Sequence, residues 1–243
     1  MERKDASLME QVKELEEFMR DADDWTKLNS CLIPYVEFPE EGNWCAVRLR
    51  HPWVYSVIGP LLPHQCNKLF EQKSAMIRKA WREGNWWKVL MCHERPYRMS
   101  LLEKLYFTGR MDIVEMRSLL LDFWTDTEIP QSNQTEPLAL FKEAVWLTDD
   151  QDGYDSLPDV LTLYRGVDGV CELSPDGPSW TLDRKVADFF AKRYAQGKTY
   201  TIRVKKNDSA VLAYITDRSE AEVILDFGKL NKGHISLVED FSG

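Results

Sequence analysis

The 243-residue chain lacks the cysteine and histidine spacing of a metal site or a disulfide framework. Its five cysteines are odd in number and widely separated, with no C-x-x-C pair, and its four histidines form no H-x-x-x-H pair. Disulfide-rich domains and zinc sites usually need such spacings. We therefore expect reduced thiols and no bound metal.

Long apolar segments are also missing. No run of eighteen apolar residues occurs, and residues 1–5 carry no apolar core of the kind found in a signal peptide. The chain also has no internal repeat and no low-complexity tract. We expect a protein that acts in the cytoplasm, where it is made, without contact with a membrane.

The chain has fewer basic than acidic residues, and the difference lies in one part of the sequence. The chain has 31 Lys+Arg against 40 Asp+Glu, a net charge of −9. Residues 161–243 hold twelve of each sign, so the excess negative charge lies in the first 160 residues. This balance disfavours tight non-specific binding of nucleic acid but leaves room for a local basic patch. The hydrophobic share of 44% is ample for a folded core.

The pattern of apolar residues indicates how the chain is organised. Residues 7–24 predict an acidic amphipathic helix, and the Pro- and Gly-rich segment from 33 to 63 predicts loops with brief strands. We expect a domain boundary after residue 62, a helical part over 63–160 and a β-rich part over 161–243. Helices followed by half-buried, mostly antiparallel strands predict an α+β fold.

Residues 76–98 combine cations with tryptophans. The cations are Arg78, Lys79, Arg82, Lys88, Arg95 and Arg98, and the aromatic residues between them are Trp81, Trp86 and Trp87. Cations beside flat aromatic faces suit single-stranded nucleic acid, through phosphate contacts and base stacking. Tryptophans in the core with solvated cations outside them are the ordinary alternative, and the sequence favours it slightly.

Three short signatures follow one another between residues 161 and 226. Leu161-Thr162-Leu163-Tyr164-Arg165-Gly166 predicts a strand ending on an arginine, whose planar fork of donors suits phosphate or ribose oxygens. Ser179-Trp180-Thr181 predicts the start of a helix, with Asp183 competing as its N-cap. Glu220-Ala221-Glu222 predicts the start of a strand, and its two carboxylates share a face if Ala221 is extended.

In this order the signatures resemble the arginine-serine-glutamate class of mono-ADP-ribosyltransferases, a family that includes many bacterial toxins. The wider runs Ser179–Ala191 and Phe123–Glu128 resemble uncharacterised bacterial and phage proteins of that class. The likeness covers roughly residues 96–227. It implies an ADP-ribosyltransferase-like split β-sandwich of mostly antiparallel strands, preceded by N-terminal helices.

The resemblance also implies NAD as a substrate and gives roles to single residues. Residues matching the NAD-binding positions are Arg165, Gly166, Ser179, Thr181 and Phe190. Glu222 would bond the 2′-hydroxyl of the nicotinamide ribose and stabilise the positive charge that develops as nicotinamide leaves. Glu220 would orient or deprotonate the acceptor.

Some residues in these motifs have other interpretations. Trp180 stands where the family often has a small polar residue. Phe189, Phe190 and Tyr194 could face nicotinamide, but a helix against a sheet buries such side chains anyway, and the core interpretation is favoured for all three.

The functional expectation is an intracellular mono-ADP-ribosyltransferase acting as a toxin or antiphage effector. Its acceptor is a protein arginine or a base in RNA or DNA, with residues 216–219 placed to touch it, and an antitoxin protein is expected as a further partner. The alternatives are an NAD glycohydrolase on the same fold and a non-catalytic partner-binding protein.

Overall fold

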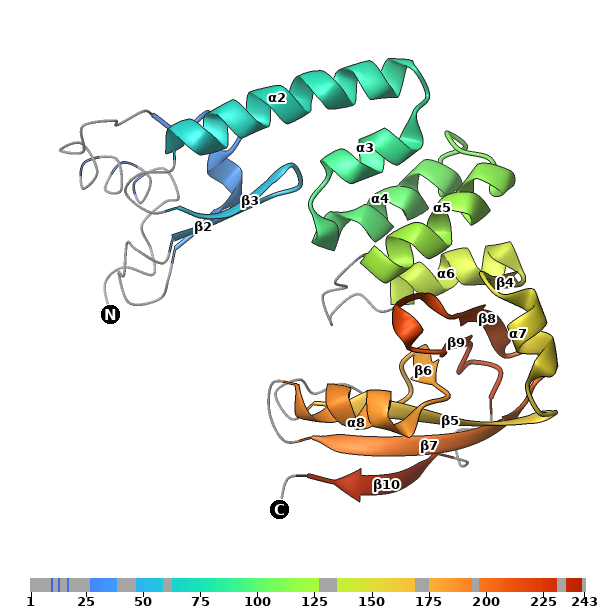
Figure 1. Ribbon diagram of the computed structural model, residues 1–243. Helices are drawn as coiled ribbons and strands as arrows, with labels where there is room; N and C mark the ends of the chain where they lie inside the picture. Colours follow the sequence, from blue (N-terminus) through green and yellow to red (C-terminus); the bar gives the residue numbers. More distant parts are fainter. Residues whose placement is uncertain are drawn as a thin grey trace. The chain divides into compact units, whose positions relative to one another are not determined.

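The computed structural model describes residues 27–38, 47–58, 63–126, 135–168, 175–193, 197–230 and 235–241, together with Glu10, Lys13 and Glu17 (Figure 1). The chain forms two compact units, residues 1–98 and 99–243. The helix predicted over residues 7–24 lies almost wholly outside the described residues.

The first unit contains a small antiparallel sheet in the order β1-β2-β3. Its strands are β1 (Val36–Glu37), β2 (Val47–His51) and β3 (Val54–Ile58), and the 3₁₀-helix η1 (Ile33–Tyr35) precedes them. Successive side chains of a strand point to opposite faces, so β2 turns Val47 and Leu49 into the core and Arg48 outward.

The boundary between the units differs from the one that the sequence predicts. Helix α2 (Pro63–Arg82) buries Cys66 in the same hydrophobic cluster as β2, and Phe70 packs against that cluster. The helix therefore belongs with the small sheet, and the units divide after Arg98 rather than after residue 62. Pro and Gly content marks loops, but it carries no information about which helix covers which sheet.

Two histidines of the first unit are structural. The Trp53 indole N–H donates to His93 Nε2 at 2.9 Å, and His93 Nδ1 lies 2.7 Å from the Val89 carbonyl oxygen. His51 Nδ1 accepts from the Trp53 backbone N–H at 3.0 Å. Burial lowers the pKa of His51 to about 4, so both the geometry and the burial favour a neutral ring.

Two further helices follow α2. Gly84, with a φ of 65°, reverses the chain, and the Asn85 side chain then caps α3 (Trp86–Cys92) by accepting from the Lys88 N–H at 3.0 Å. Helix α4 (Arg95–Phe107) contains the boundary between the units. Both helices fall within the helical part that the sequence predicts over residues 63–160.

The second unit is built on one sheet in the order β10-β7-β5-β6-β9-β8-β4, with helices beside it (Figure 1). The helices are α5 (Ile113–Asp126), α6 (Thr135–Ala144), α7 (Gln151–Ser156) and α8 (Arg184–Lys192). The strands are β4 (Leu147–Thr148), β5 (Val160–Val167), β6 (Ser179–Thr181), β7 (Lys198–Lys205), β8 (Val211–Ile215), β9 (Glu222–Leu225) and β10 (Ser236–Asp240). Neighbouring strands are antiparallel except for β4 and β8, which confirms the α+β class with mostly antiparallel pairing.

The sheet of the second unit is narrow at its centre. Strands β5 and β7 pair along their full length from Val160 to Val167. Among the described residues, β5 and β6 instead pair at one position, Tyr164 with Thr181. The sheet therefore consists of two halves, β10-β7-β5 and β6-β9-β8-β4, joined at this position.

Helix α8 lies directly on β5 at Gly166 (Figure 1). A Cβ atom at Gly166 would lie 1.9 Å from the Ala187 carbonyl oxygen and 2.6 Å from the Ala191 nitrogen. Only glycine allows the helix backbone to approach the strand this closely. Gly166 is therefore a packing residue in this fold.

Candidate functional site

Arg165 is buried near the end of β5, beside the junction of the two half-sheets. Only 8% of it is exposed, and its Nη1 donates to the Ser179 carbonyl oxygen at 2.7 Å. Within the described part of the chain, its buried Nε has no hydrogen-bond acceptor. Burial lowers the pKa of Arg165 to about 10, against the opposing pull of Glu222 and Asp176. The guanidinium is still charged at neutral pH, with one buried donor unused.

Ser179 and Glu222 meet across the neighbouring strands. Ser179 lies on β6 and Glu222 opens β9, and these strands pair antiparallel. The Ser179 hydroxyl donates to Glu222 Oε1, and the Trp124 indole N–H donates to Glu222 Oε2 at 3.0 Å. Each carboxylate oxygen thus receives one donor from a different element, which fixes the orientation of the carboxylate.

The pKa of Glu222 reflects two opposing causes. Burial raises it, and the nearby Glu220 raises it further. The donors Ser179 and Trp124 and the charge of Arg165 act the other way. The net effect is a raised pKa, and the two hydrogen bonds and the arginine limit the rise.

Thr181 of β6 helps to fix the position of the neighbouring strand β9. It pairs with Tyr164 on one side and with Glu222 on the other. Its hydroxyl donates to the Glu220 carbonyl oxygen and accepts from the Asp183 N–H at 3.0 Å. One side chain therefore fixes both the approach to Glu222 and the start of α8.

The predicted start of α8 is wrong by several residues. Ser179, Trp180 and Thr181 form strand β6, and the helix begins at Arg184. Asp183 is the N-cap, because its carboxylate accepts from the Lys185 N–H at 2.8 Å. A Ser-x-Thr before an amphipathic run fits both a strand end and a helix cap, and strand pairing decides between them here.

Trp180 is explained by the core of the second unit. Its ring is fully buried, stacks on Phe227 with centroids 5.5 Å apart, and donates from its indole N–H to the Gly177 carbonyl oxygen at 2.9 Å. It pairs with Val223 of β9. The Trp180 ring, between Ser179 and Thr181 in the sequence, therefore fills space in the core of the second unit.

The condition under which the two acids of the Glu-x-Glu motif would share a face is not met. Ala221 has a φ of 44°, which is left-handed rather than extended. The alternation that would place Glu220 and Glu222 on one face therefore does not apply. The pKa of Glu220 is also raised, mainly by burial and partly by Asp217, while Arg218 and Arg193 lower it.

The loop before Glu222 is held in an unfavourable backbone conformation. Arg218 and Ser219 have φ values of 59° and 57°, a region that non-glycine residues seldom adopt. Asp149 anchors the loop, because its carboxylate accepts from the backbone N–H groups of Thr216 at 2.9 Å and Asp217 at 3.1 Å. A strained loop that is pinned at its base is common beside binding sites.

The aromatic residues of α8 divide between two environments. Phe189 is 62% exposed, so the prediction that it belongs to the core is wrong. Phe190 is half-buried, and its ring packs edge-on against Phe189 at 5.5 Å. Tyr194 lies outside the described residues. A helix nine residues long has room for only one face against the sheet, and Ala187 and Ala191 occupy it.

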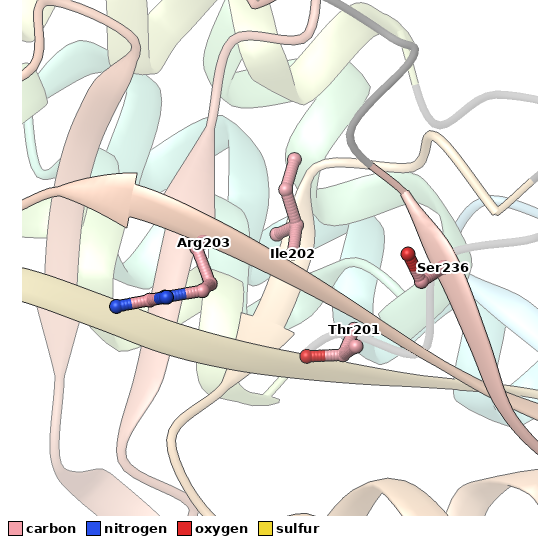
Figure 2. Close-up of a pocket in the computed structure, with 4 residues that line it drawn as sticks. All are labelled: Thr201, Ile202, Arg203 and Ser236. Carbon is pink, nitrogen blue, oxygen red and sulfur yellow. The ribbon is translucent and has the colours of Figure 1, made fainter.

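A pocket with a different set of lining residues lies on β7 and β10. It is lined by Thr201, Ile202 and Arg203 of β7 and by Ser236 of β10 (Figure 2). In the sheet order, β7 and β10 lie on the other side of β5 from β6 and β9. We place the candidate site at the junction of β5, β6 and β9 because the buried charges and their donors are there.

The residues described by the structure include no group of three or more His, Cys, Asp or Glu side chains that could hold a metal ion. No helix in that part of the chain is both long and apolar enough to cross a membrane.

The geometry defines a buried arginine, serine and glutamate site on a mixed α+β unit. Searches of protein-family models, curated proteins and solved structures found no match for this chain.

Trp124 is the site residue that sequence reasoning left without a role. It belongs to the run Phe123–Glu128 that carries part of the family resemblance, yet its sequence separation from Glu222 is 98 residues. Its ring is buried and packs edge-on against Phe141 at 5.0 Å, so the indole N–H is rigidly held. The only available signal was its position within that run.

Trp124→Phe tests this contact through pH. The substitution keeps an aromatic ring but removes a donor that lowers the pKa of Glu222, so that pKa rises further. If ionised Glu222 is needed for NAD cleavage, we expect a loss of about tenfold or more, larger at pH 6 than at pH 8. The measurement is nicotinamide release across pH 5 to 9.

A matched control is Trp146→Phe, which removes an indole hydrogen bond to Gln151 in an exposed position. We expect the control to keep the parent pH profile. An unchanged profile in Trp124→Phe would show that Trp124 has no part in setting the charge of Glu222.

Proposed function

We propose that this chain is an NAD-dependent mono-ADP-ribosyltransferase of the arginine-serine-glutamate class. The observation that carries the proposal is the convergence of Arg165, Ser179 and Glu222 from three strands into one hydrogen-bonded group. These are the residues to which the family resemblance gives roles in NAD binding and cleavage. The narrow junction between β5 and β6 supports a split β-sandwich, with the site at the split.

The donors at the site suit an anionic, hydroxylated substrate such as NAD. Arg165 carries a full charge and a buried Nε without an acceptor in the described part of the chain, so a diphosphate oxygen would meet an unused donor. Ser179 joins this arginine to the carboxylate, because its carbonyl accepts from Arg165 and its hydroxyl donates to Glu222. One ligand could therefore contact both the cation of Arg165 and the anion of Glu222.

Glu222 would act at the nicotinamide ribose. Its carboxylate has lone pairs beyond those used by Ser179 and Trp124, so it can accept a hydrogen bond from the ribose 2′-hydroxyl. A negative charge held here stabilises the positive charge that grows on the ribose as the bond to nicotinamide breaks. Ser179 and Trp124 hold the carboxylate in place, so little reorganisation is needed during the reaction.

Glu220 would serve the acceptor. In the transfer, the bond between nicotinamide nitrogen and the ribose anomeric carbon breaks, and a bond from the acceptor nitrogen to that carbon forms. The proton released by the acceptor passes to Glu220, whose raised pKa makes it a better base than an ordinary glutamate. The 216–219 loop, pinned by Asp149, would position the acceptor beside it.

One observation favours a second candidate, an NAD glycohydrolase in which water is the acceptor. The left-handed Ala221 removes the shared face of Glu220 and Glu222 that the sequence predicts. A hydrolase needs Glu222 but not a second acid aimed at a macromolecular acceptor. Action inside the cell as a toxin or antiphage effector, with an antitoxin partner, rests on the family resemblance in both cases.

The proposal is tested with purified full-length protein, ³²P-labelled NAD and a cell lysate. Samples are divided and treated with RNase, DNase or protease before label in macromolecules is counted. Transfer predicts label that one of these treatments removes, and that treatment identifies the acceptor. Nicotinamide release without bound label would favour the hydrolase. If neither free nicotinamide nor bound label is formed, the non-catalytic alternative is the one that remains.

A further inference from the structure

The first unit carries an exposed surface on α2 and α3 that the proposed transferase site does not use. The α2–α3 surface is defined here by Arg78, Lys79, Trp81, Arg82, Trp87 and Lys88. Trp81 is 41% exposed and Trp87 is 50% exposed. Two exposed methionines, Met76 and Met91, lie on the same helices. Exposed apolar side chains that cluster, unlike those scattered singly, often mark an interaction site.

The neighbouring tryptophan explains how these rings are supported. Trp86 is buried, and its ring meets Trp81 edge-on with centroids 5.1 Å apart. Trp87, the next residue on α3, is turned outward, because successive residues of a helix point about 100° apart. Of the three tryptophans, only Trp86 belongs to the core. Trp81 and Trp87 are exposed at the surface.

Positive charge gathers on the same helices. Residues 63–92 contain six Lys+Arg and two Glu in a chain whose net charge is −9. Arg78, Lys79 and Arg82 are exposed on the last turns of α2, within six residues of Trp81. Their local contacts are a bond from Arg78 to Ser74 at 2.7 Å, a bond from Arg82 to the Arg78 carbonyl and a weak pairing of Lys79 with Glu83 at 3.9 Å. All three side chains are exposed.

One cation of the sequence motif does not contribute. Arg98 is buried, and its Nε donates to the His93 carbonyl oxygen at 2.9 Å, close to the C-terminal end of α3. Arg98 therefore stabilises the end of that helix. The α2–α3 surface therefore does not include Arg98.

We propose that the α2–α3 surface binds single-stranded nucleic acid. Exposed indole faces can stack on bases only where the bases are unpaired, and the cations beside them match the phosphate backbone. An apolar protein partner would gain from the tryptophans but would offer no negative charge to the four cations. The inference concerns residues of the first unit, whereas the proposed NAD-site residues belong to the second, and it does not depend on NAD turnover.

The test uses the full chain and three fluorescein-labelled probes, a uridine 15-mer, a thymidine 15-mer and a 15-base-pair RNA duplex. Binding is followed by fluorescence anisotropy between 50 and 250 mM NaCl, with quenching of tryptophan emission as a second signal. We expect binding of a single-stranded probe, weaker binding of the duplex and a log–log salt slope of about −3, since each neutralised phosphate contributes about −0.7. Preference for the uridine or the thymidine probe decides between RNA and DNA as the source.

Substitutions separate stacking from charge. Trp87→Ala is expected to weaken binding of the single-stranded probes by roughly tenfold or more without changing the salt slope. The triple change Arg78→Gln, Lys79→Gln, Arg82→Gln is expected to make the slope less steep by about 2. Glutamine is a good helix former, so this variant keeps α2 even if the tryptophan variant folds poorly.

A matched control removes three exposed cations from the second unit, by Lys185→Gln, Arg203→Gln and Lys205→Gln. It should bind the probes like the parent protein. The proposal is overturned if no single-stranded probe binds at 50 mM NaCl, if the duplex binds as well as the single strands, or if the control loses as much affinity as the α2–α3 triple variant. The exposed tryptophans would then be left for a protein partner.

Discussion

Glu222→Gln is expected to lower the rate of NAD cleavage by about 10²- to 10³-fold, the usual cost of losing a preorganised electrostatic contact in a transition state. Glutamine has nearly the same shape but no charge, so it cannot stabilise the positive charge that develops on the ribose. Its amide also places a donor opposite either the Ser179 hydroxyl or the Trp124 indole N–H, both of which donate to Glu222 in the structure. The measurement is nicotinamide release at saturating NAD, with thermal unfolding measured in parallel.

Glu239→Gln is the matched control. Glu239 lies on β10 at the other edge of the sheet and pairs in solvent with Arg184 at 2.9 Å. This variant should cleave NAD at the parent rate. If Glu222→Gln retains full cleavage with normal unfolding, the assignment of Glu222 as the carboxylate of the reaction is wrong.

Glu220→Gln adds a comparison between transfer and hydrolysis. In a transferase it should lower the labelling of the acceptor more than the release of nicotinamide, because Glu220 would act on the acceptor. In a glycohydrolase it should leave nicotinamide release close to the parent value.

Gly166→Ala is expected to destabilise the second unit by about 3 kcal/mol or more, at the upper end of the cost of overpacking. The added Cβ would lie 1.9 Å from the Ala187 carbonyl oxygen and 2.6 Å from the Ala191 nitrogen. Both are backbone atoms of α8, so no side chain can rotate away and the whole helix must move off β5. The measurement is urea unfolding followed by far-ultraviolet circular dichroism.

Gly228→Ala is the control for this substitution. A Cβ at Gly228 would meet only the Asp226 side chain, at 3.1 Å, and the backbone there is not left-handed. We expect a change of about 1 kcal/mol or less. Equal stability of Gly166→Ala and the parent would mean that α8 does not pack on β5 as closely as the structure describes.

This second prediction also bears on how Gly166 is interpreted. The family motif places it among the NAD-binding positions, and the structure gives it a separate reason to be glycine. If Gly166→Ala unfolds the unit, loss of activity in that variant says nothing about NAD binding. Glu222→Gln tests the site more directly, because Ser179 and Trp124, the two side chains that donate to Glu222, are unchanged.

Several parts of the site followed from the sequence alone. The alternation of Leu161 and Leu163 predicts the strand that carries Arg165, and the structure has it as β5. The family resemblance groups Arg165, Ser179 and Glu222, and hydrogen bonds join the three in the structure, while their roles stay predictions. Strand periodicity and residue chemistry are local properties, so a sequence can reveal them without knowledge of the packing.

Other parts depended on contacts between distant segments. Trp124 reaches Glu222 across 98 residues, and only the packing of α5 beside the sheet makes that hydrogen bond. The left-handed Ala221 and the exposed Phe189 also contradict local patterns, because loop closure and the narrow face of α8 decide them.

The sequence by itself determined the α+β class, the strand of Arg165 and the chemical types available at the site. The tertiary structure decided which helix joins the first unit, which tryptophans of residues 76–98 are exposed, and which donors hold Glu222. The physical reason is the distance along the chain over which each kind of interaction acts. Propensity and periodicity act over a few residues, whereas burial and hydrogen bonding between strands and helices depend on how segments far apart in the chain pack together.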